Sequence, residues 1–387
     1  MNRRRFLQNA AWGAVAASAS QLAASPPHNL PSVSLPKLDI HAPARAKPSP
    51  LGMPGLFPER VVEVFDPGCI AKGEVSAPAV QAMVDRGIKE LTGEKNAAAA
   101  WKRFVSPEDV VGLKVNASGA PLIITTPELL RIVAEGVLSA GVKPENLFVY
   151  ERFPGQLLHT GYDKVIPSGV RIVGIESKRD PLGGYDPEVY FQAKFFGERD
   201  TRSLMARLVS QRVTKIINLP NFKEHNAAGV TGCLKNVSYG SFSNVGRTHE
   251  PPLTYTDPLI PILCNIEPLR SKVVLNIMDA LRGVWHAGPF ASPPTFIYEV
   301  KSLYFGTDPV AIDRLELDAI EKKRLQEGAP SLWDRDPAHL TKDFEEVKHD
   351  PQKNPFYRAP QYIERAATMG LGVYDTQKIH HQRIVMG

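Results

Sequence analysis

The sequence predicts an α/β fold in which helices cover both faces of a largely parallel or mixed sheet. Short apolar runs, which are typical of strands, alternate with amphipathic helical segments from residue 61 to residue 325. One run, residues 273–278, is almost continuously apolar, as expected for a strand buried on both faces. Both observations favour a sheet built from crossover units. The chain has 387 residues, 43% of them hydrophobic, so it can bury the core that such a sheet needs.

The expected strands are short apolar runs, and they cover residues 61–65, 110–115, 147–150, 170–175, 215–219 and 273–278, with one or two strands over 296–305. The expected helices carry apolar side chains at helical spacing, and they cover residues 77–91, 127–139, 204–211, 308–325 and 361–369. Start and stop signals support these bounds. Thr126 precedes the helix over residues 127–139, and Gly141 follows it. Pro309 follows Asp308 in the first turn of the helix over residues 308–325.

Composition divides the chain into four segments. Residues 1–24 are expected to be an export signal. Residues 25–58 contain nine prolines, which indicates an extended tether or a strap along the surface. Residues 59–375 are expected to form the α/β domain, in which residues 334–360 wrap around the core, and residues 376–387 a C-terminal tail.

The first residues contain an arginine pair, Arg3 and Arg4, followed by one residue and then by Phe6 and Leu7. This is the pattern of a twin-arginine export signal, and an alanine-rich apolar stretch follows it. The stretch is too short and too weakly apolar for a permanent membrane span. We therefore expect the twin-arginine translocase as a partner during export, and a periplasmic or otherwise extracytoplasmic location. A basic amphipathic surface helix is the alternative.

Two small-residue sequences, at residues 17–19 and 22–24, are candidate cleavage sites for this signal. Residues 1–24 contribute three arginines and no acid to the formal net charge of +5, so the remaining chain is close to neutral. No block of lysine and arginine stands out elsewhere, so we expect no nucleic-acid partner.

The three cysteines, Cys69, Cys233 and Cys264, form no C-x-x-C pair. The spacing of an iron–sulfur cluster or of a structural zinc site is therefore missing, and we expect no iron–sulfur cluster. Three buried, small apolar side chains are the favoured interpretation, although an odd thiol count in an oxidising compartment leaves at least one cysteine unpaired.

The densest polar region spans residues 218–249 and begins at the end of an expected strand, where an α/β sheet places its ligands. A helix that begins near Gly229 would present free N–H groups to an anion. Lys223 and Lys235 add positive charge, and His225 and His249 could bind a metal or transfer protons. The alternative is a glycine-rich helix packed against the sheet, with its lysines in water.

Polar side chains also follow two other expected strands. Lys114 and Asn116 lie on one face of a strand, near its carboxyl edge. Asp279 ends the most apolar strand, which is a common position for a metal-binding or acid–base carboxylate, and His286 follows on a glycine-containing loop. Asp308 is explained as a helix cap.

The candidate site residues share these positions at strand ends. We assign as catalytic Lys114, Lys223, Lys235 and Asp279, as ligand-binding Asn116, Gly232, Asn236 and Arg247, and as metal-ligating His225, His249 and His286. The motifs G-x-x-x-x-G-K-[ST] and G-x-G-x-x-G are absent, so nucleotide binding is unsupported. The motifs G-x-S-x-G and H-E-x-x-H are absent as well.

Several short motifs, taken in order, resemble the domain-of-unknown-function 362 family over residues 60–375. They are residues 114–116, 126–128, 220–225, 232–236 with Gly240, Arg247 with His249, Asp279, 288–289, 308–313 and 367–372. The resemblance implies an α/β fold and a site at these positions, but no agreed reaction. Some members of that family carry a ferredoxin-like segment with cysteine clusters, which this chain lacks.

The site residues favour an exported enzyme that acts on a small anionic molecule, with a divalent metal as one candidate cofactor. In this interpretation the three lysines hold negative charge, the two asparagines orient the ligand, and Asp279 with a histidine binds a metal or moves protons. A non-catalytic extracytoplasmic protein that binds an anion or a metal is the first alternative. A structural partner of an exported redox complex is the second.

Overall fold

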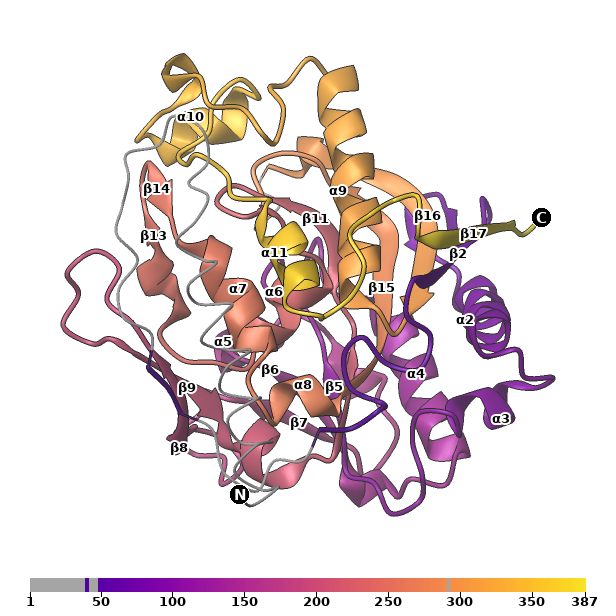
Figure 1. Ribbon diagram of the computed structural model, residues 1–387. Coiled ribbons are helices and arrows are strands. Elements are labelled where there is room, and N and C mark those ends of the chain that lie inside the picture. The colour runs from indigo at the N-terminus through magenta and orange to yellow at the C-terminus, as the bar shows by residue number, and fades with distance from the viewer. Residues whose placement is uncertain (1–38, 42–47, 291–292) are drawn as a thin grey trace.

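The computed structural model describes residues 39–41, 48–290 and 293–387, and these residues contain one large mixed sheet flanked by helices (Figure 1). This confirms the α/β fold. The sheet has ten strands, and its main path runs in the order β17 (His380–Val385), β2 (Arg60–Phe65), β16 (Ile297–Gly306), β15 (Val273–Val284), β10 (Lys215–Asn218), β5 (Val111–Lys114), β6 (Leu147–Glu151) and β7 (Arg171–Gly174). Off this path, β11 (Asn221–His225) pairs with the second half of β15 and with β12 (Gly229–Val230).

Strand direction places the carboxyl ends of the central strands at one edge of the sheet. β15, β10, β5, β6 and β7 pair in parallel, whereas β16 is antiparallel to both β15 and β2. Lys114 ends β5 and Glu151 ends β6, the neighbouring strand. These two side chains therefore lie side by side at the carboxyl edge of the sheet, where parallel sheets commonly bind ligands.

Helices cover both faces of the sheet, as the sequence predicts (Figure 1). One face is covered by α2 (Ala77–Thr92), α3 (Ala97–Trp101) and α4 (Pro127–Ser139), whose apolar side chains pack with those of β2, β5 and β6. The other face is covered by α6 (Gly232–Tyr239), α7 (Thr256–Cys264), α8 (Leu269–Lys272), α9 (Pro309–Gln326) and α11 (Tyr362–Thr368). The short helices α5 (Pro154–Leu157) and α10 (Phe344–His349) lie near the edge that carries the site.

One predicted helix is wrong. Residues 204–211 were expected to be helical, but β9 (Arg202–Ala206) occupies the first part and a single π-helical turn, Leu208–Arg212, follows. β9 pairs with β8 (Tyr185–Gln192), which in turn pairs with β1 (Asp39–His41), to form a separate three-stranded sheet. This long-range pairing overrides a local pattern that also fits a helix.

The described part of the proline-rich segment lies against the domain. β1 pairs with β8, and Met53 is buried while its N–H donates to the carbonyl of Arg270. The N–H of Phe57 donates to Thr307 Oγ1 at 2.9 Å. Residues 376–387, expected as a tail, contain β17, which pairs in parallel with β2 and so extends the main sheet. The export signal expected over residues 1–24 lies outside the described residues.

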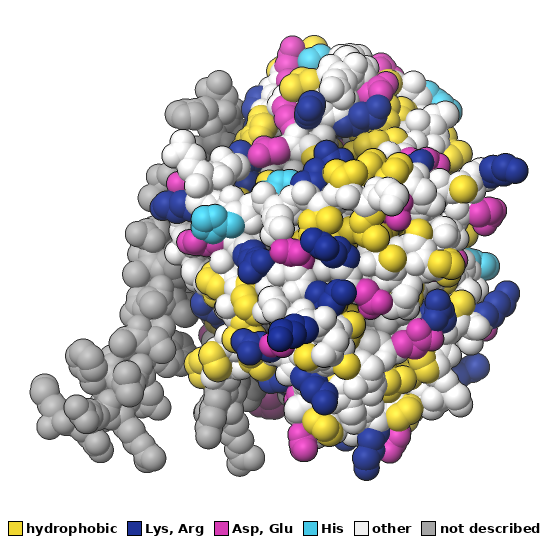
Figure 2. Space-filling view, turned by 90° about the vertical axis from the view of Figure 1, so that its right-hand side faces the viewer, with side chains coloured by type: hydrophobic (Ala, Val, Ile, Leu, Met, Phe, Trp, Pro, Cys, Tyr) yellow, Lys and Arg dark blue, Asp and Glu magenta, His cyan; other side chains and the backbone are white. Residues whose placement is uncertain are grey.

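Charge on the surface is mixed on the face that forms the right-hand side of Figure 1, where acidic and basic side chains are interspersed (Figure 2). Cys69, Cys233 and Cys264 are buried free thiols, which confirms the interpretation of the cysteines as small core residues. Within the described ranges, no helix combines the length and the apolar character needed to cross a membrane.

Close packing between α2 and β16 gives a test of the fold. A Cβ added at Gly87 would overlap the ring of Phe305, so Gly87→Ala should lower the free energy of unfolding by about 2 kcal/mol. Gly155 has open space around it, so Gly155→Ala should change stability by less than about 0.5 kcal/mol. Urea unfolding of both variants measures the difference, and equal stability of the two would contradict the packing described.

Candidate functional site

A cavity of about 400 Å³ opens at the carboxyl edge of β5 and β6. Its wall combines strand ends, the helix α6 and loops from distant parts of the chain. The polar lining residues are Lys114, Asn116, Ser118, Glu151, Arg152, Gln156, His225, Asn226, Thr231, Lys235, Asn236, Tyr239 and His249. Phe153, Phe290, Phe344 and Phe356 supply much of its apolar lining. The structure thus brings six of the predicted site residues, namely Lys114, Asn116, His225, Lys235, Asn236 and His249, into one cavity wall.

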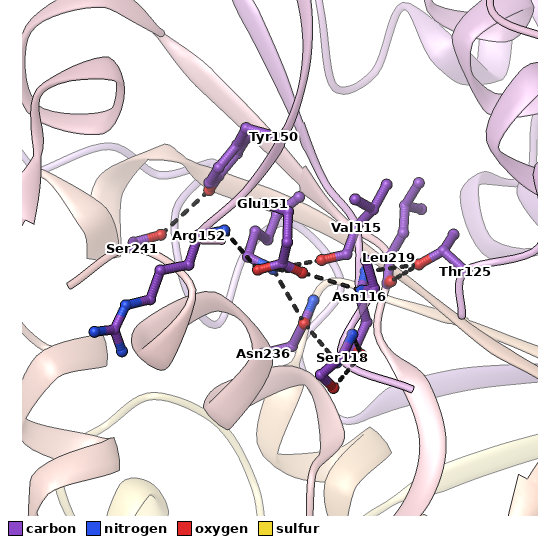
Figure 3. A network of polar contacts seen from close by, with 12 residues as sticks. Val115, Asn116, Ser118, Thr125, Tyr150, Glu151, Arg152, Leu219, Asn236 and Ser241 are labelled. Carbon is purple, nitrogen blue, oxygen red and sulfur yellow. Dashed lines mark hydrogen bonds and ion pairs between the residues drawn. The ribbon is translucent and has the colours of Figure 1, made fainter. Parts of the chain in front are cut away.

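The inner wall is built around a buried ion pair between adjacent strand ends. Lys114 Nζ lies 3.1 Å from Glu151 Oε2 and 3.3 Å from Asn236 Oδ1, and it also donates to the carbonyl of Val115. Glu151 accepts further hydrogen bonds from the N–H groups of Ala117 and Arg152, at 3.1 and 2.6 Å (Figure 3). Burial lowers the pKa of Lys114, and the adjacent Glu151 opposes this shift. The pair is therefore neutral overall and its groups are fully hydrogen-bonded.

A row of asparagine amides connects this wall to the centre of the sheet. Asn116 Nδ2 donates to Asn236 Oδ1 at 2.9 Å, and Asn236 Nδ2 donates to Asn218 Oδ1 at 2.7 Å. Asn218 Nδ2 continues the row to Asn276 Oδ1 at 2.9 Å. The side-chain amides of Asn116 and Asn236 are thus engaged with other protein groups. Their main effect is to fix the lysines and α6, since few of their donors and acceptors remain for a ligand.

Lys223 lies behind the cavity wall. Its side chain is fully buried, and its Nζ donates to Asn116 Oδ1 at 2.8 Å and to Ser118 Oγ at 2.7 Å. Burial lowers the pKa of Lys223 to about 7; Glu151 opposes this shift and Lys114 adds to it. Asn116 Oδ1 and Ser118 Oγ accept hydrogen bonds from this amine and fix its position.

Lys235 occupies the wall facing the cavity, in the first turn of α6. Its side chain is 9% exposed, and no described residue accepts a hydrogen bond from its Nζ. The Nζ lies 4.2 Å from the centre of the Tyr239 ring, one helical turn later. Burial, together with the positive charges of Lys223, Arg152 and Lys114, lowers the pKa of Lys235 to about 7. Lys235 is therefore the cavity lysine whose ammonium form has the least support from the protein.

Two histidines complete the polar wall, with ring centres 5.7 Å apart. His225 Nδ1 accepts the N–H groups of Ala227 and Ala228 at 3.1 and 3.3 Å. The neutral ring therefore carries its proton on Nε2, which makes His225 a hydrogen-bond donor rather than a metal ligand at that nitrogen. Burial lowers the pKa of His225 well below its usual value and that of His249 to about 3, so both rings are neutral near pH 7.

The three expected metal ligands do not come together. His286 lies apart from the cavity, where its Nε2 donates to the carbonyl of Val347 at 2.8 Å and its Nδ1 lies 3.1 Å from Arg324 Nη1. Across residues 39–41, 48–290 and 293–387, no group of three or more histidine, cysteine, aspartate and glutamate side chains is arranged to hold a metal ion.

Asp279 also lies outside the cavity, because β15 does not end where the sequence indicated. The strand continues to Val284, where it pairs with β16 and β11, and this places Asp279 within it. Its carboxylate accepts the N–H of Thr126 at 2.7 Å and the N–H of Leu281 at 3.1 Å. Burial raises the pKa of Asp279 to about 6. Asp279 therefore fixes the start of α4 instead of facing the cavity.

The start of α6 binds a protein carboxylate rather than a ligand. Cys233 and Leu234 donate their N–H groups to the two oxygens of Asp313, at 2.5 and 3.0 Å. Gly232 has a φ of +57°, and a Cβ there would overlap the same carboxylate. The anion-binding N-terminus expected near Gly229 is thus formed at Gly232 and is already filled from α9.

Arg247 anchors a loop beside the cavity instead of lining it. Its guanidinium donates to the carbonyl of Ala193 at 2.5 Å, to Glu198 at 2.9 Å and to Ser203 at 3.0 Å. These contacts tie the turn before His249 to the loop that joins β8 and β9.

Sequence reasoning missed several residues of the wall, chiefly Ser118, Glu151, Arg152, Tyr239 and Phe356. Glu151 directly follows an expected strand, just as Lys114 lies at the end of another. Its position in the sequence could therefore have indicated that it belongs to the site. Tyr239 lies one turn after Lys235 in a helix, which is also readable. Phe356 comes from a segment with no local pattern that points to the cavity.

Comparison with known protein families gives one match. The family model described as Domain of unknown function (DUF362) matches residues 111–318, which extend from the start of β5 into α9. The matched range contains all of the polar cavity residues named above. No curated protein matches the chain.

Burial of Lys235 should lower the free energy of unfolding. Below a pH of about 7 the folded protein carries the full cost of the buried charge, so Lys235→Met should raise the free energy of unfolding at pH 6 by roughly 2 kcal/mol. Between pH 7 and 10.5 the lysine is protonated in the unfolded chain but neutral in the folded protein, so the stability of the wild type rises with pH. The difference in stability between Lys235→Met and the wild type should therefore shrink as pH rises. Urea unfolding at pH 6 and pH 9.5 measures this, with Lys322→Met on the surface of α9 as control. A variant that is less stable than the wild type at both pH values would contradict the prediction.

Proposed function

The chain belongs to the DUF362 family, whose reaction is unassigned, and we propose that it is an enzyme that binds and acts on a small anionic molecule in the cavity beside Lys235. The observation that carries this proposal is the cavity-facing amine of Lys235, which is almost buried and has no hydrogen-bond acceptor among the described residues. A polar group in such a position normally has a partner, so a ligand atom is the natural acceptor.

The charge balance of the cavity supports an anionic ligand. Glu151 is the one carboxylate among the lining residues, and its charge is matched by Lys114. Lys235 adds positive charge to the wall, and Lys223 adds more from directly behind it, whereas the Nε of Arg152 is already paired with Glu176 at 2.8 Å. Low-dielectric walls strengthen the attraction of such a cavity for negative charge. A volume of about 400 Å³ suits a molecule of metabolite size.

The pKa values of the lysines favour an enzyme over a binding protein. A lysine with a pKa of about 7 changes its charge near neutral pH, which suits proton transfer or nucleophilic attack. A site that only captures anions is better served by a group that stays charged, as arginine does. The non-catalytic binding protein therefore remains the outcome expected if ligand binding occurs without turnover.

The arginine pair near the N-terminus supports the proposal that this enzyme works outside the cytoplasm. We expect Arg3→Lys with Arg4→Lys to retain the protein in the cytoplasm at its full length, because the translocase recognises the pair. Cell fractionation with intact-mass measurement checks this. Equal export of the wild type and the double variant would contradict the twin-arginine route.

Ligand binding should depend on the charge of Lys235. We expect small carboxylates and phosphate to be the anions that bind, and their affinity should fall about tenfold between pH 6 and pH 8 as an amine with a pKa of about 7 loses its proton. Thermal-shift screening with malonate, succinate and phosphate, followed by calorimetry on the best binder, measures this.

Variants separate the charge of Lys235 from its shape. Lys235→Arg should bind the anion with a much flatter pH profile, because arginine stays protonated. Lys235→Ala should lose most of the affinity, and Lys322→Ala should match the wild type. Unchanged affinity in Lys235→Ala would refute the proposal.

A further inference from the structure

We infer that Lys235 forms an imine with the carbonyl group of an anionic oxo compound, such as a 2-oxo acid, in this cavity. The inference rests on the proposed function, since it names the substrate class of the same site. Only a neutral amine can attack a carbonyl carbon, and the three lysines in and behind the cavity wall differ in their surroundings.

Two of the three lysines are committed to other partners. Lys114 is paired with Glu151 and also donates to two other oxygens, so its protons are fully used. Lys223 donates to Asn116 and Ser118, and its fully buried amine does not line the cavity. Neither amine is free to meet a ligand carbon.

Lys235 has the opposite surroundings. It lines the cavity, and none of the described residues accepts a hydrogen bond from its amine. The charged groups that shift its pKa are all cations, namely Lys223, Arg152 and Lys114. Lys223 is the cation that most disfavours a positive charge at Lys235. An adjacent cation is a recognised way to keep a lysine amine neutral and nucleophilic. The same pKa of about 7 leaves a large share of Lys235 unprotonated at neutral pH.

The other lining groups fit the steps of imine formation. Nζ attacks the carbonyl carbon, the new C–N bond forms, and the carbonyl oxygen takes up a proton to give a carbinolamine. Loss of water then leaves the C=N bond, so both amine protons depart with the oxygen and no external oxidant or reductant is needed. His225, with its proton on Nε2, is a neutral donor in the same wall. Arg152 also lies in the wall, and although its Nε is paired with Glu176 at 2.8 Å, its terminal N–H groups can donate to the substrate's carboxylate.

Reductive trapping tests the inference. The purified full chain is incubated with pyruvate or 2-oxoglutarate and sodium cyanoborohydride at pH 7.5, and the product is analysed by intact mass and peptide mapping. We expect one reduced adduct per chain, located on Lys235, formed at least tenfold faster than any adduct on another lysine. Lys235→Arg should remove it, while Lys322→Ala should leave it unchanged.

Parallel binding measurements with lactate and malate, which lack the carbonyl group, separate this inference from the proposed function. Anion binding without an adduct on Lys235 would overturn the imine and leave the anion site standing. Adducts spread evenly over surface lysines would overturn it as well. Neither binding nor adduct would overturn both proposals. A folding defect in one variant would also abolish the adduct. Lys235→Met is therefore trapped alongside Lys235→Arg, and cooperative thermal unfolding of both variants confirms that they are folded.

Discussion

The organising constraint in this molecule is the cost of burying three neighbouring lysines, two in the cavity wall and one directly behind it. Glu151 neutralises Lys114, and no second acid lines the described part of the cavity wall, while Glu316 accepts the backbone N–H of Lys223 rather than its amine. Burying an unpaired charge is costly: the Lys223 amine has two neutral acceptors, and burial lowers the pKa of both Lys223 and Lys235 to about 7. This arrangement of buried lysines therefore determines both the charge and the reactivity of Lys235.

The rest of the fold holds this arrangement in place. The parallel pairing of β5 and β6 sets Lys114 beside Glu151, and the row of asparagine amides fixes α6 to the sheet. The carboxylate of Asp313 fills the N-terminus of α6, which orients the helix that carries Lys235. These groups touch no ligand, but they position the amine that does. Sites that depend on such buried polar groups commonly reduce stability in exchange for function.

Much of the fold could be predicted because strands and helices carry local patterns, and the positions of Lys114 and Lys235 followed from the rule that parallel sheets bind ligands at their carboxyl edge. The errors came from long-range pairing. The length of β15 depends on β16 and β11, and no local signal showed that it would include Asp279. Likewise, Asp313 was recognised as helical, but only the packing of α9 on α6 shows that it caps Gly232–Tyr239. The exclusion of His286 from the cavity also depends on distant partners, Arg324 and Val347.

The charge balance of the cavity and the chemistry proposed for it both depend on the lowered pKa of Lys235, and titration of this amine measures that pKa directly. Lysine labelled with ¹³C at Cε allows each amine to be followed by NMR as pH changes, and Lys235→Arg assigns the signal. A midpoint of about 7 is the result predicted here. A midpoint near the ordinary value of 10.5 would show that the ammonium form is stable in the cavity, and it would contradict both the charge balance and the chemistry built on it.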